Sequence, residues 1–326
     1  MKKILITGGA GFIGSHLIKR LVDVGYDVVV IDNLERGCKE NIKSVLNKIT
    51  FLKLDLRDYD STVKYFKNVD IVIHLASKVG GIGTYTSQPY EILSNNMLID
   101  SNVLRAVLEN GVNKYFYASS AHVYPKQLQK TKDSPKMLEE NVYPADCELS
   151  YGWGKLIGEK QIEYAVKEHP NFNAAIARFI GIYGTNQDYE LETGSVIPVF
   201  SHRAIKYPEV PFNVWGDGTE TRSYCFIDDT LDCIELMVGG LETMRLTNVN
   251  VGKEERNSIT EIAESIINIS NKNIIIDYDK TNPTKIWGQW CDCSLVEKLY
   301  DWRATTSLND GLKVVYNDIK ERLGYE

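Results

Sequence analysis

A glycine-rich loop directly behind an apolar run constrains the fold of this chain more than any other feature. Residues 4–7 are apolar and β-branched, and Gly8, Gly11 and Gly14 follow before an amphipathic stretch begins. Glycines are needed where a backbone turns tightly, approaches a pyrophosphate and packs a helix against a strand. The N-terminus of the following helix offers free N–H groups and a positive dipole end to phosphates. The order strand, loop, helix therefore predicts a dinucleotide-binding βαβ unit.

The remaining pattern predicts an α/β fold with a Rossmann-type, doubly wound parallel sheet, because apolar runs alternate with amphipathic stretches. We expect strands at 4–7, 28–32, 50–54, 71–75, 115–119 and 174–179, and helices at 13–24, 59–67, 90–109 and 151–168. After about residue 180, turn signals such as Trp215-Gly216-Asp217-Gly218 interrupt the pattern. We therefore expect residues 1–180 to form a cofactor-binding domain that carries the catalytic residues. Residues 181–326 would form a smaller α+β lobe, with some chain crossing back.

Composition excludes several classes of protein. The net charge of −7 argues against a nucleic-acid binder, and no apolar run is long enough to span a membrane. The first residues lack the features of a signal peptide, and six cysteines in 326 residues do not indicate a disulfide framework. Cys291 and Cys293 have no second pair nearby, so we expect no metal site. The expected location is the reducing cytoplasm.

An acidic residue at the end of the second expected strand selects the cofactor. Asp32 lies eighteen residues after Gly14. A carboxylate there accepts hydrogen bonds from the ribose hydroxyls and repels a 2′-phosphate, so NAD is expected instead of NADP. Arg36 is near enough in sequence to weaken this preference. The alternative is that Asp32 only begins a turn.

Tyr151 and Lys155 form the expected catalytic pair. They are four residues apart at the start of a predicted helix, so their side chains leave the same face. A phenol with an ordinary pKa of about 10 is a poor base, but a nearby ammonium and the positive nicotinamide ring would lower that pKa. Tyr151 would then accept the proton of a substrate hydroxyl. A tyrosine and a lysine at this spacing are often exposed residues without a catalytic function. The glycine loop of this chain is what favours the catalytic role.

Taken together, the motifs of this chain resemble the extended short-chain dehydrogenase/reductase family, and within it the nucleotide-sugar epimerases and dehydratases. The resemblance extends from Lys3 to about Lys320. It rests on Thr7–Gly14, Asp32-Asn33, Asp55-Leu56, His74–Ser77, Ser119–Pro125, Tyr151–Lys155, Trp215–Gly218, Arg222–Tyr224 and Phe226–Asp229.

The resemblance implies a role for each matching residue. NAD would contact Gly8, Gly11, Phe12, Ile13, Gly14, Asp32, Asn33, Asp55, Leu56, Leu75, Ala76, Tyr151 and Lys155. Ser120 would hold the reacting hydroxyl beside Tyr151, and Arg222 would contact the phosphates of the sugar nucleotide through its bidentate donors. The substrate set implied is Gly81, Ser120, His122, Tyr151, Trp215, Arg222 and Gln289. His74 is expected to be a packing residue at a strand end.

Within the family, the chain is most similar to the GDP-mannose 3,5-epimerases, so a GDP-sugar is the favoured substrate. The departures fall at chemically important positions. The catalytic cysteine of that group is His122 here, and its lysine is Val196. The asparagine of an Arg-Phe-His-Asn segment is Gly181, and an arginine of the C-terminal substrate loop is Gln289. Double epimerisation by a cysteine–lysine pair is therefore disfavoured.

The reaction expected is epimerisation through a transient 4-keto sugar. Oxidation at C4 acidifies the hydrogens on C3 and C5, and His122 lies two residues after Ser120. Its imidazole, with an ordinary pKa of about 6.5, is a competent second acid/base. Alternatively, His122 only lines the sugar pocket and inversion occurs at C4 with no second base. A 4,6-dehydratase, a 4-dehydrogenase or a non-catalytic binding protein remain the alternative functions.

The expected partner, besides the nucleotide sugar, is a second copy of the chain. In this family the helices matching 90–109 and 151–168 form a dimer interface. The apolar residues of the first one could equally face the protein's own sheet: they are Ile99, Val103, Leu104, Val107 and Leu108.

Overall fold

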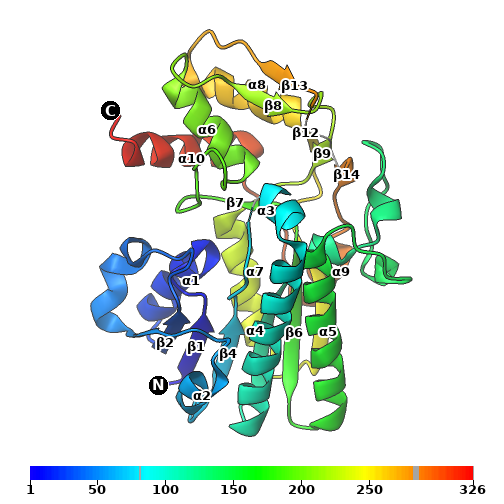
Figure 1. Cartoon of the computed structure of the whole chain (residues 1–326). Helices are drawn as coiled ribbons and strands as arrows, with labels where there is room; N and C mark the ends of the chain where they lie inside the picture. The colour runs from blue at the N-terminus through cyan, green and yellow to red at the C-terminus, as the bar shows by residue number, and fades with distance from the viewer. Residues whose placement is uncertain (81, 282–285, 326) are drawn as a thin grey trace.

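A seven-stranded parallel sheet forms the centre of the computed structural model, which describes residues 1–80, 82–281 and 286–325 (Figure 1). The strand order β11-β6-β5-β4-β1-β2-β3 means that the chain starts inside the sheet and winds outward in both directions. This confirms the predicted doubly wound α/β fold, and the six predicted strands begin and end within one residue of their expected bounds. The strands are β1 (Lys3–Thr7), β2 (Asp27–Asp32), β3 (Thr50–Lys53), β4 (Ile71–His74), β5 (Lys114–Ser120), β6 (Asn173–Phe179) and β11 (Leu246–Val251).

Helices cover both faces of the sheet, which explains why its strands are almost continuously apolar. One face packs against α1 (Phe12–Asp23) and α7 (Ile227–Gly240), and the other against α4 (Pro89–Glu109) and α5 (Ser150–Glu168). In β1, for example, Ile4 and Ile6 join the first core cluster while Leu5 joins the second. Side chains alternate in this way because successive residues of a strand point to opposite faces.

The helix predicted over 59–67 is the main local difference from expectation. It is a single α-helical turn, α2 (Tyr59–Thr62), followed by a 3₁₀ turn over Val63–Phe66. The Thr62 hydroxyl donates a 2.9 Å hydrogen bond to the carbonyl oxygen of Asp58. Such side-chain bonds to the backbone compete with regular helix formation.

The apolar residues of α4 face the protein's own sheet. Ile99, Val103, Leu104 and Val107 are all buried in the second core cluster, and Leu108 packs against it. The sequence left open whether these residues form a dimer interface or pack on the protein's own sheet. In the structure they pack on the sheet.

Most of the rest of the chain forms short strands and helices beyond the carboxyl ends of the sheet strands (Figure 1). The helices α6, α8 and α10 pack on one another, while β11 and α7 return to the large sheet. The elements are α3 (Ile82–Ser87), β7 (Ile182–Tyr183), α6 (Val196–Lys206), β8 (Asn213–Trp215), β9 (Thr221–Arg222), β10 (Cys225–Phe226), β12 (Asn257–Ser258), α8 (Ile259–Ser270), β13 (Asp277–Asp279), β14 (Gly288–Gln289), α9 (Ser294–Tyr300) and α10 (Leu308–Arg322).

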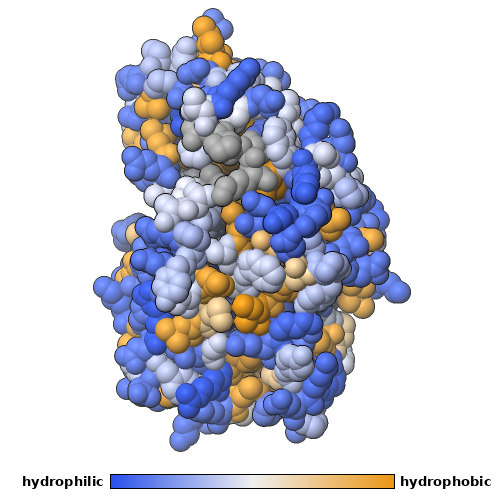
Figure 2. Space-filling model, turned by 45° about the vertical axis from the view of Figure 1, so that its right-hand side comes forward, coloured by the Kyte–Doolittle hydropathy of each residue, from blue (hydrophilic) through white to orange (hydrophobic). Residues whose placement is uncertain are grey.

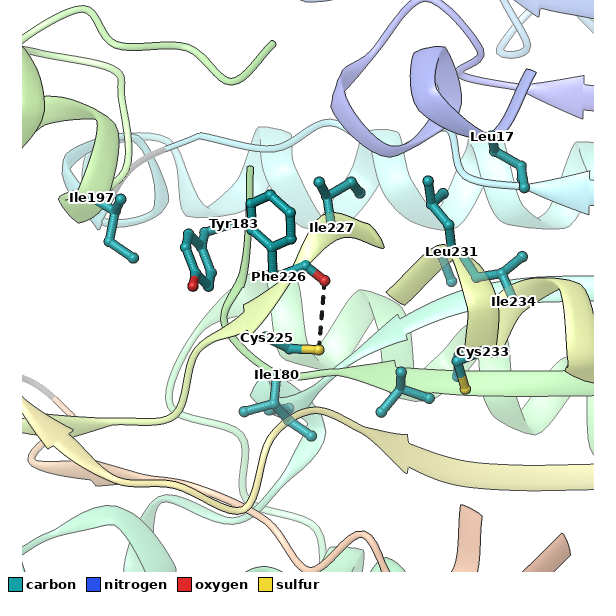
Figure 3. Close-up of a cluster of buried hydrophobic side chains, with 14 of the residues drawn as sticks. Leu17, Ile180, Tyr183, Ile197, Cys225, Phe226, Ile227, Leu231, Cys233 and Ile234 are labelled. Carbon is teal, nitrogen blue, oxygen red and sulfur yellow. Dashed lines mark hydrogen bonds between the residues drawn. The ribbon is translucent and has the colours of Figure 1, made fainter. Parts of the chain in front are cut away.

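One continuous apolar core joins these parts. Figure 3 shows side chains of α1, β7, α6, β10 and α7 converging, among them Leu17, Tyr183, Ile197 and Phe226. All four are less than one-tenth exposed. Within the described part of the chain, no helix combines the length and the apolarity that crossing a membrane requires.

Candidate active site

A cavity of about 580 Å³ lies at the carboxyl ends of β1, β2, β3 and β4. This is the edge where open α/β sheets bind ligands. Apart from Tyr151 and Lys155, every residue that the sequence predicts to contact the cofactor lines this cavity: Gly8, Gly11, Phe12, Ile13, Gly14, Asp32, Asn33, Asp55, Leu56, Leu75 and Ala76. The glycine loop and the acidic strand end therefore belong to one site.

The glycine loop could not accept side chains. Gly8 has a φ of +71°, and a Cβ there would lie 2.8 Å from the backbone of Ala76. A Cβ at Gly14 would overlap the carbonyl oxygen of Gly8. Helix α1 has no side-chain cap at Gly11, so the N–H groups of its first turn are available to an anion. The loop fits the pyrophosphate of a dinucleotide.

The other end of the cavity suits an unphosphorylated ribose. Asp32 is buried and accepts N–H bonds from Ala10 (2.9 Å) and Leu34 (2.8 Å). Burial raises the pKa of its carboxyl group, and these two bonds oppose the rise. Arg36, which weakened the cofactor prediction, pairs with Asp188 at 2.9 Å, and Arg57 pairs with Asp55 at 2.5 Å. Both arginines are thus engaged with carboxylates, which favours NAD over a 2′-phosphorylated cofactor.

Tyr151 lies in the first turn of α5, where its hydroxyl meets two serines. They are Ser120, at the end of β5, and Ser77, in the loop after β4, and both are near enough to lower the pKa of the phenol. Burial raises the pKa of Tyr151, the neighbouring Tyr85 phenol and Asp100 carboxylate add to the rise, and the two serines lower it. The lowering predicted from the ammonium and the nicotinamide ring together concerns the NAD-bound enzyme and stays a prediction.

Lys155 is 1% exposed, one helical turn after Tyr151 on the same face. Its Nζ lies 6.0 Å from the ring centroid of Tyr151 and 4.7 Å from that of Tyr117. Burial lowers the pKa of Lys155, while the carboxylates of Asp100 and Glu159 raise it.

His122 is brought against Tyr151, as the spacing from Ser120 predicts. It lies on a 3₁₀ turn (Ala121–Val123) that follows β5, and its ring centroid is 5.8 Å from that of Tyr151. A Cβ at Gly152 would overlap the His122 carbonyl oxygen, so this turn packs directly on the start of α5. Burial and the charge of Arg222 lower the pKa of His122 to about 4. At neutral pH the imidazole is therefore uncharged.

The predicted substrate residues of the second half of the chain are only partly gathered. Arg222 of β9 lies beside Gln289 of β14 in a parallel pair, and its guanidinium donates to the carbonyl oxygens of Thr221 and Ile286. Gln289 is buried and donates to Gln129 at 2.9 Å. Trp215, at the end of β8, is 47% exposed. Gly81 lies outside the described residues.

Two residues beside Tyr151 were not predicted. The ring of Tyr85, on the short helix α3, stacks on that of Tyr151 with centroids 5.2 Å apart. Ser77 is held by Asn96 of α4, whose Oδ1 accepts its hydroxyl at 2.9 Å. Ser77 directly follows Leu75 and Ala76, which the sequence predicts to contact the cofactor. Its position could therefore have indicated that it lies near the active site. The sequence around Tyr85 contains no pattern that would have placed this residue beside Tyr151.

His74 is a packing residue, as expected, but it also belongs to a polar network. It is fully buried, with Nδ1 2.6 Å from the Thr7 hydroxyl and Nε2 2.9 Å from the Asp100 carboxylate. The two cysteines near the C-terminus, Cys291 and Cys293, have their sulfur atoms 3.5 Å apart in the core. Among the described residues, no group of three or more His, Cys, Asp or Glu side chains is arranged to hold a metal ion.

Comparisons with known proteins agree with this geometry. Residues 4–252 match the model of the NAD dependent epimerase/dehydratase family. GDP-mannose 3,5-epimerase 1 of Oryza sativa subsp. indica is 32% identical over 99% of this chain and 83% of the relative. A UDP-N-acetyl-alpha-D-glucosaminuronate decarboxylase of Bacillus cytotoxicus is 28% identical over 96% of each chain.

Solved structures share the fold over almost the full length. The UDP-glucose 4-epimerase of Thermotoga maritima, solved with UDP-glucose, has a TM-score of 0.85 at 22% identity and covers 98% of this chain and 99% of its own. The UDP-glucose 4-epimerase of Thermus thermophilus, in complex with NAD, has a TM-score of 0.84 at 22% identity, with the same coverage. With the family model matching most of the sequence and a 32% identical relative spanning almost all of it, this chain is an enzyme that belongs to the NAD-dependent epimerase/dehydratase family of nucleotide-sugar enzymes and uses NAD as its cofactor.

Proposed function

We propose that this enzyme epimerises a nucleotide sugar, with a GDP-sugar favoured, through a transient ketone at C4 of the sugar. One observation carries the proposal: the Tyr151 hydroxyl meets Ser120 and Ser77 beside the glycine-loop cavity, and His122 packs on the same phenol ring. A proton acceptor, a hydroxyl-binding group and a second titratable side chain are therefore gathered at one point.

Tyr151 would accept the proton of the C4 hydroxyl while Ser120 holds that hydroxyl by a hydrogen bond. NAD, when bound, supplies the acceptor for the hydride that leaves C4. Lys155 would place a positive charge behind the phenol and so favour its deprotonated form. Return of the hydride to C4 and of the proton from Tyr151 to the C4 oxygen completes the cycle without net consumption of cofactor.

The centre that inverts depends on His122. With a pKa of about 4 the imidazole is neutral at pH 7 and free to accept a proton from C3 or C5 of the keto sugar, but it is a weaker base than an ordinary histidine. Inversion at C4, where the ketone receives hydride on its other face, needs no second base. Inversion at C3 or C5 with His122 as the base and inversion at C4 without a second base are both compatible with the arrangement around Tyr151.

The similarity to the rice GDP-mannose 3,5-epimerase supports a GDP-sugar, whereas the decarboxylase relative acts on a UDP-sugar according to its name. We propose that residues 181–326 mainly bind this nucleotide sugar and that Arg222 contacts its phosphates. Arg222 is available for this role because its guanidinium donates to backbone carbonyl oxygens, which are neutral.

We also propose that the enzyme is a homodimer joined through α4 and α5. These helices pack side by side and expose large apolar side chains to solvent: Tyr90, Met97, Leu98, Trp153 and Tyr164. Figure 2 shows apolar side chains grouped on the lower half of the face that is turned toward the viewer. The mass of the purified protein in solution should be twice the 36.9 kDa of the chain.

The test is to incubate the purified enzyme with GDP-, UDP- and dTDP-sugars in D₂O and to follow the products by NMR. We expect one sugar to be converted to an epimer, with a GDP-sugar converted fastest. Solvent deuterium at C3 or C5 would show that a second base acts there, and failure of His122→Ala to incorporate it would assign that role to His122. An epimer without deuterium would indicate inversion at C4. Loss of the C6 hydroxyl, or NADH released in proportion to product, would contradict the proposal.

A further inference from the structure

We propose that Asp100 is the counter-ion of Lys155 and the positioning residue of the Tyr151–Lys155 pair. This inference rests on the proposed function, since it concerns how the catalytic pair is kept in its working charge state. Asp100 lies in the middle of α4, across the helix interface from α5, and is 2% exposed. A carboxylate is kept at such a buried position only when other groups compensate its charge.

Two hydrogen-bond donors hold the Asp100 carboxylate in place. The Tyr117 hydroxyl, from β5, donates to Oδ2 at 2.5 Å, and His74 Nε2, from β4, lies 2.9 Å from Oδ1. Burial lowers the pKa of His74, so its ring is neutral at pH 7 and Nε2–H is the donor. Neither donor supplies a positive charge, and the carboxylate still needs one.

Lys155 supplies that charge. Its Nζ lies 4.7 Å from the ring centroid of Tyr117, the residue that donates to Asp100. Burial would raise the pKa of Asp100, but the Lys155 ammonium and the bonds from His74 and Tyr117 lower it. A Cβ at Gly158, one turn further along α5, would overlap the Tyr117 hydroxyl. The glycine thus lets α5 approach closely enough for the two charges to interact.

Glu159, the other carboxylate near Lys155, already has a partner. It forms a buried ion pair with Arg178 of β6, with Nη2 and Oε2 2.7 Å apart. The remaining titratable groups that face the Asp100–Lys155 pair are His74 on β4, Tyr115 and Tyr117 on β5, and Tyr151 on α5. Asp100 is therefore the carboxylate whose charge is free to balance Lys155.

The same network reaches the cofactor loop. His74 Nδ1 accepts from the Thr7 hydroxyl, and that hydroxyl oxygen accepts the backbone N–H of Ala76 at 3.3 Å. Thr7 precedes the glycine loop, and Ala76 lines the cavity. Asp100 thus connects the floor of the cofactor site to the catalytic helix through side chains that are all buried.

The test is the pH dependence of kcat/KM in Asp100→Asn. Removing a negative charge stabilises the uncharged form of Lys155 and the phenolate of Tyr151, so the pKa of each falls. Activity needs Tyr151 able to accept a proton and Lys155 charged, so both limbs of the profile move in the same direction. We expect the pH optimum to fall by about 1 unit and activity on the alkaline limb to fall by about tenfold.

Three variants separate this role from a structural one. Asp229→Asn removes a different buried carboxylate, which accepts the N–H groups of Thr305 and Thr306, and should leave the pH optimum unchanged. Tyr117→Phe removes one bond to Asp100 but keeps its charge, and should shift the optimum much less than Asp100→Asn. Asp100→Ser, with a smaller neutral side chain, replaces Asp100→Asn if that variant does not bind NAD.

An unchanged optimum in a folded, NAD-binding Asp100 variant would overturn the inference, and so would an equal shift in Tyr117→Phe. Either result would leave the proposed function standing, because that function is tested by the identity of the product. Conversely, absence of epimerase activity in the unaltered enzyme would remove the proposed function before Asp100 is examined.

Discussion

Tyr151→Phe is expected to lower kcat by about a thousandfold while leaving NAD binding intact. The substitution removes only the hydroxyl that meets Ser120 and Ser77. The aromatic ring that stacks on Tyr85 and packs on His122 is retained, so the site keeps its shape. The cofactor cavity is lined by other residues and should bind NAD as before.

Turnover and NAD content, measured on the same preparation, check this prediction. Tyr164→Phe is the matched control, because Tyr164 lies on the same helix but is 59% exposed. It should retain full activity. Undiminished turnover in Tyr151→Phe would show that another group moves the proton.

Arg178→Met is expected to destabilise the fold by about 3–5 kcal/mol, because it leaves the buried Glu159 carboxylate without its cation. The side chains of this pair are 4% and 1% exposed. Glu159 also accepts the Ser119 hydroxyl at 2.5 Å and the Asn248 amide at 3.0 Å. The pair therefore ties the catalytic helix α5 to β5, β6 and β11, and its loss should affect all of them.

Urea unfolding of the two proteins measures the difference. The double variant Arg178→Met with Glu159→Leu should recover part of the lost stability, since a buried ion pair is often replaceable by apolar groups. Arg105→Met, which breaks an exposed pair with Glu109, serves as the control and should change the midpoint little. Equal midpoints for Arg178→Met and the unaltered protein would contradict the importance of the pair.

The first half of the fold was predictable because local sequence and global structure agree there. Strands such as 4–7 and 28–32 are apolar on both faces, as expected in a parallel sheet covered by helices. The glycines of 8–14 follow the first strand directly and indicate a dinucleotide-binding loop. The second half was not predictable in detail. Its strands β7, β9, β10, β12 and β14 are two residues long, and their pairing with distant segments defines them more than any local pattern.

The candidate site also has a part that the sequence predicts and a part that it does not. Tyr151 and Lys155 could be proposed from their helical spacing together with the glycine loop, and Ser120 from the resemblance of its segment to the family. The interaction proposed between Asp100 and Lys155, and the stacking of Tyr85 on Tyr151, join elements that only tertiary structure brings together. The pKa of Tyr151 was also beyond the sequence, because its direction depends on how completely the ring is buried.

A substrate labelled with deuterium at C4 tests the central claim most directly. If the sugar is oxidised and reduced again at C4 within one site, the deuterium leaves as a hydride equivalent and returns to the same carbon. We expect mass spectrometry and NMR to find the epimer with its label retained at C4 and turnover slowed by a primary isotope effect. An epimer that has lost the C4 label to solvent, or that forms with no isotope effect and an undisturbed C4 bond, would contradict the account.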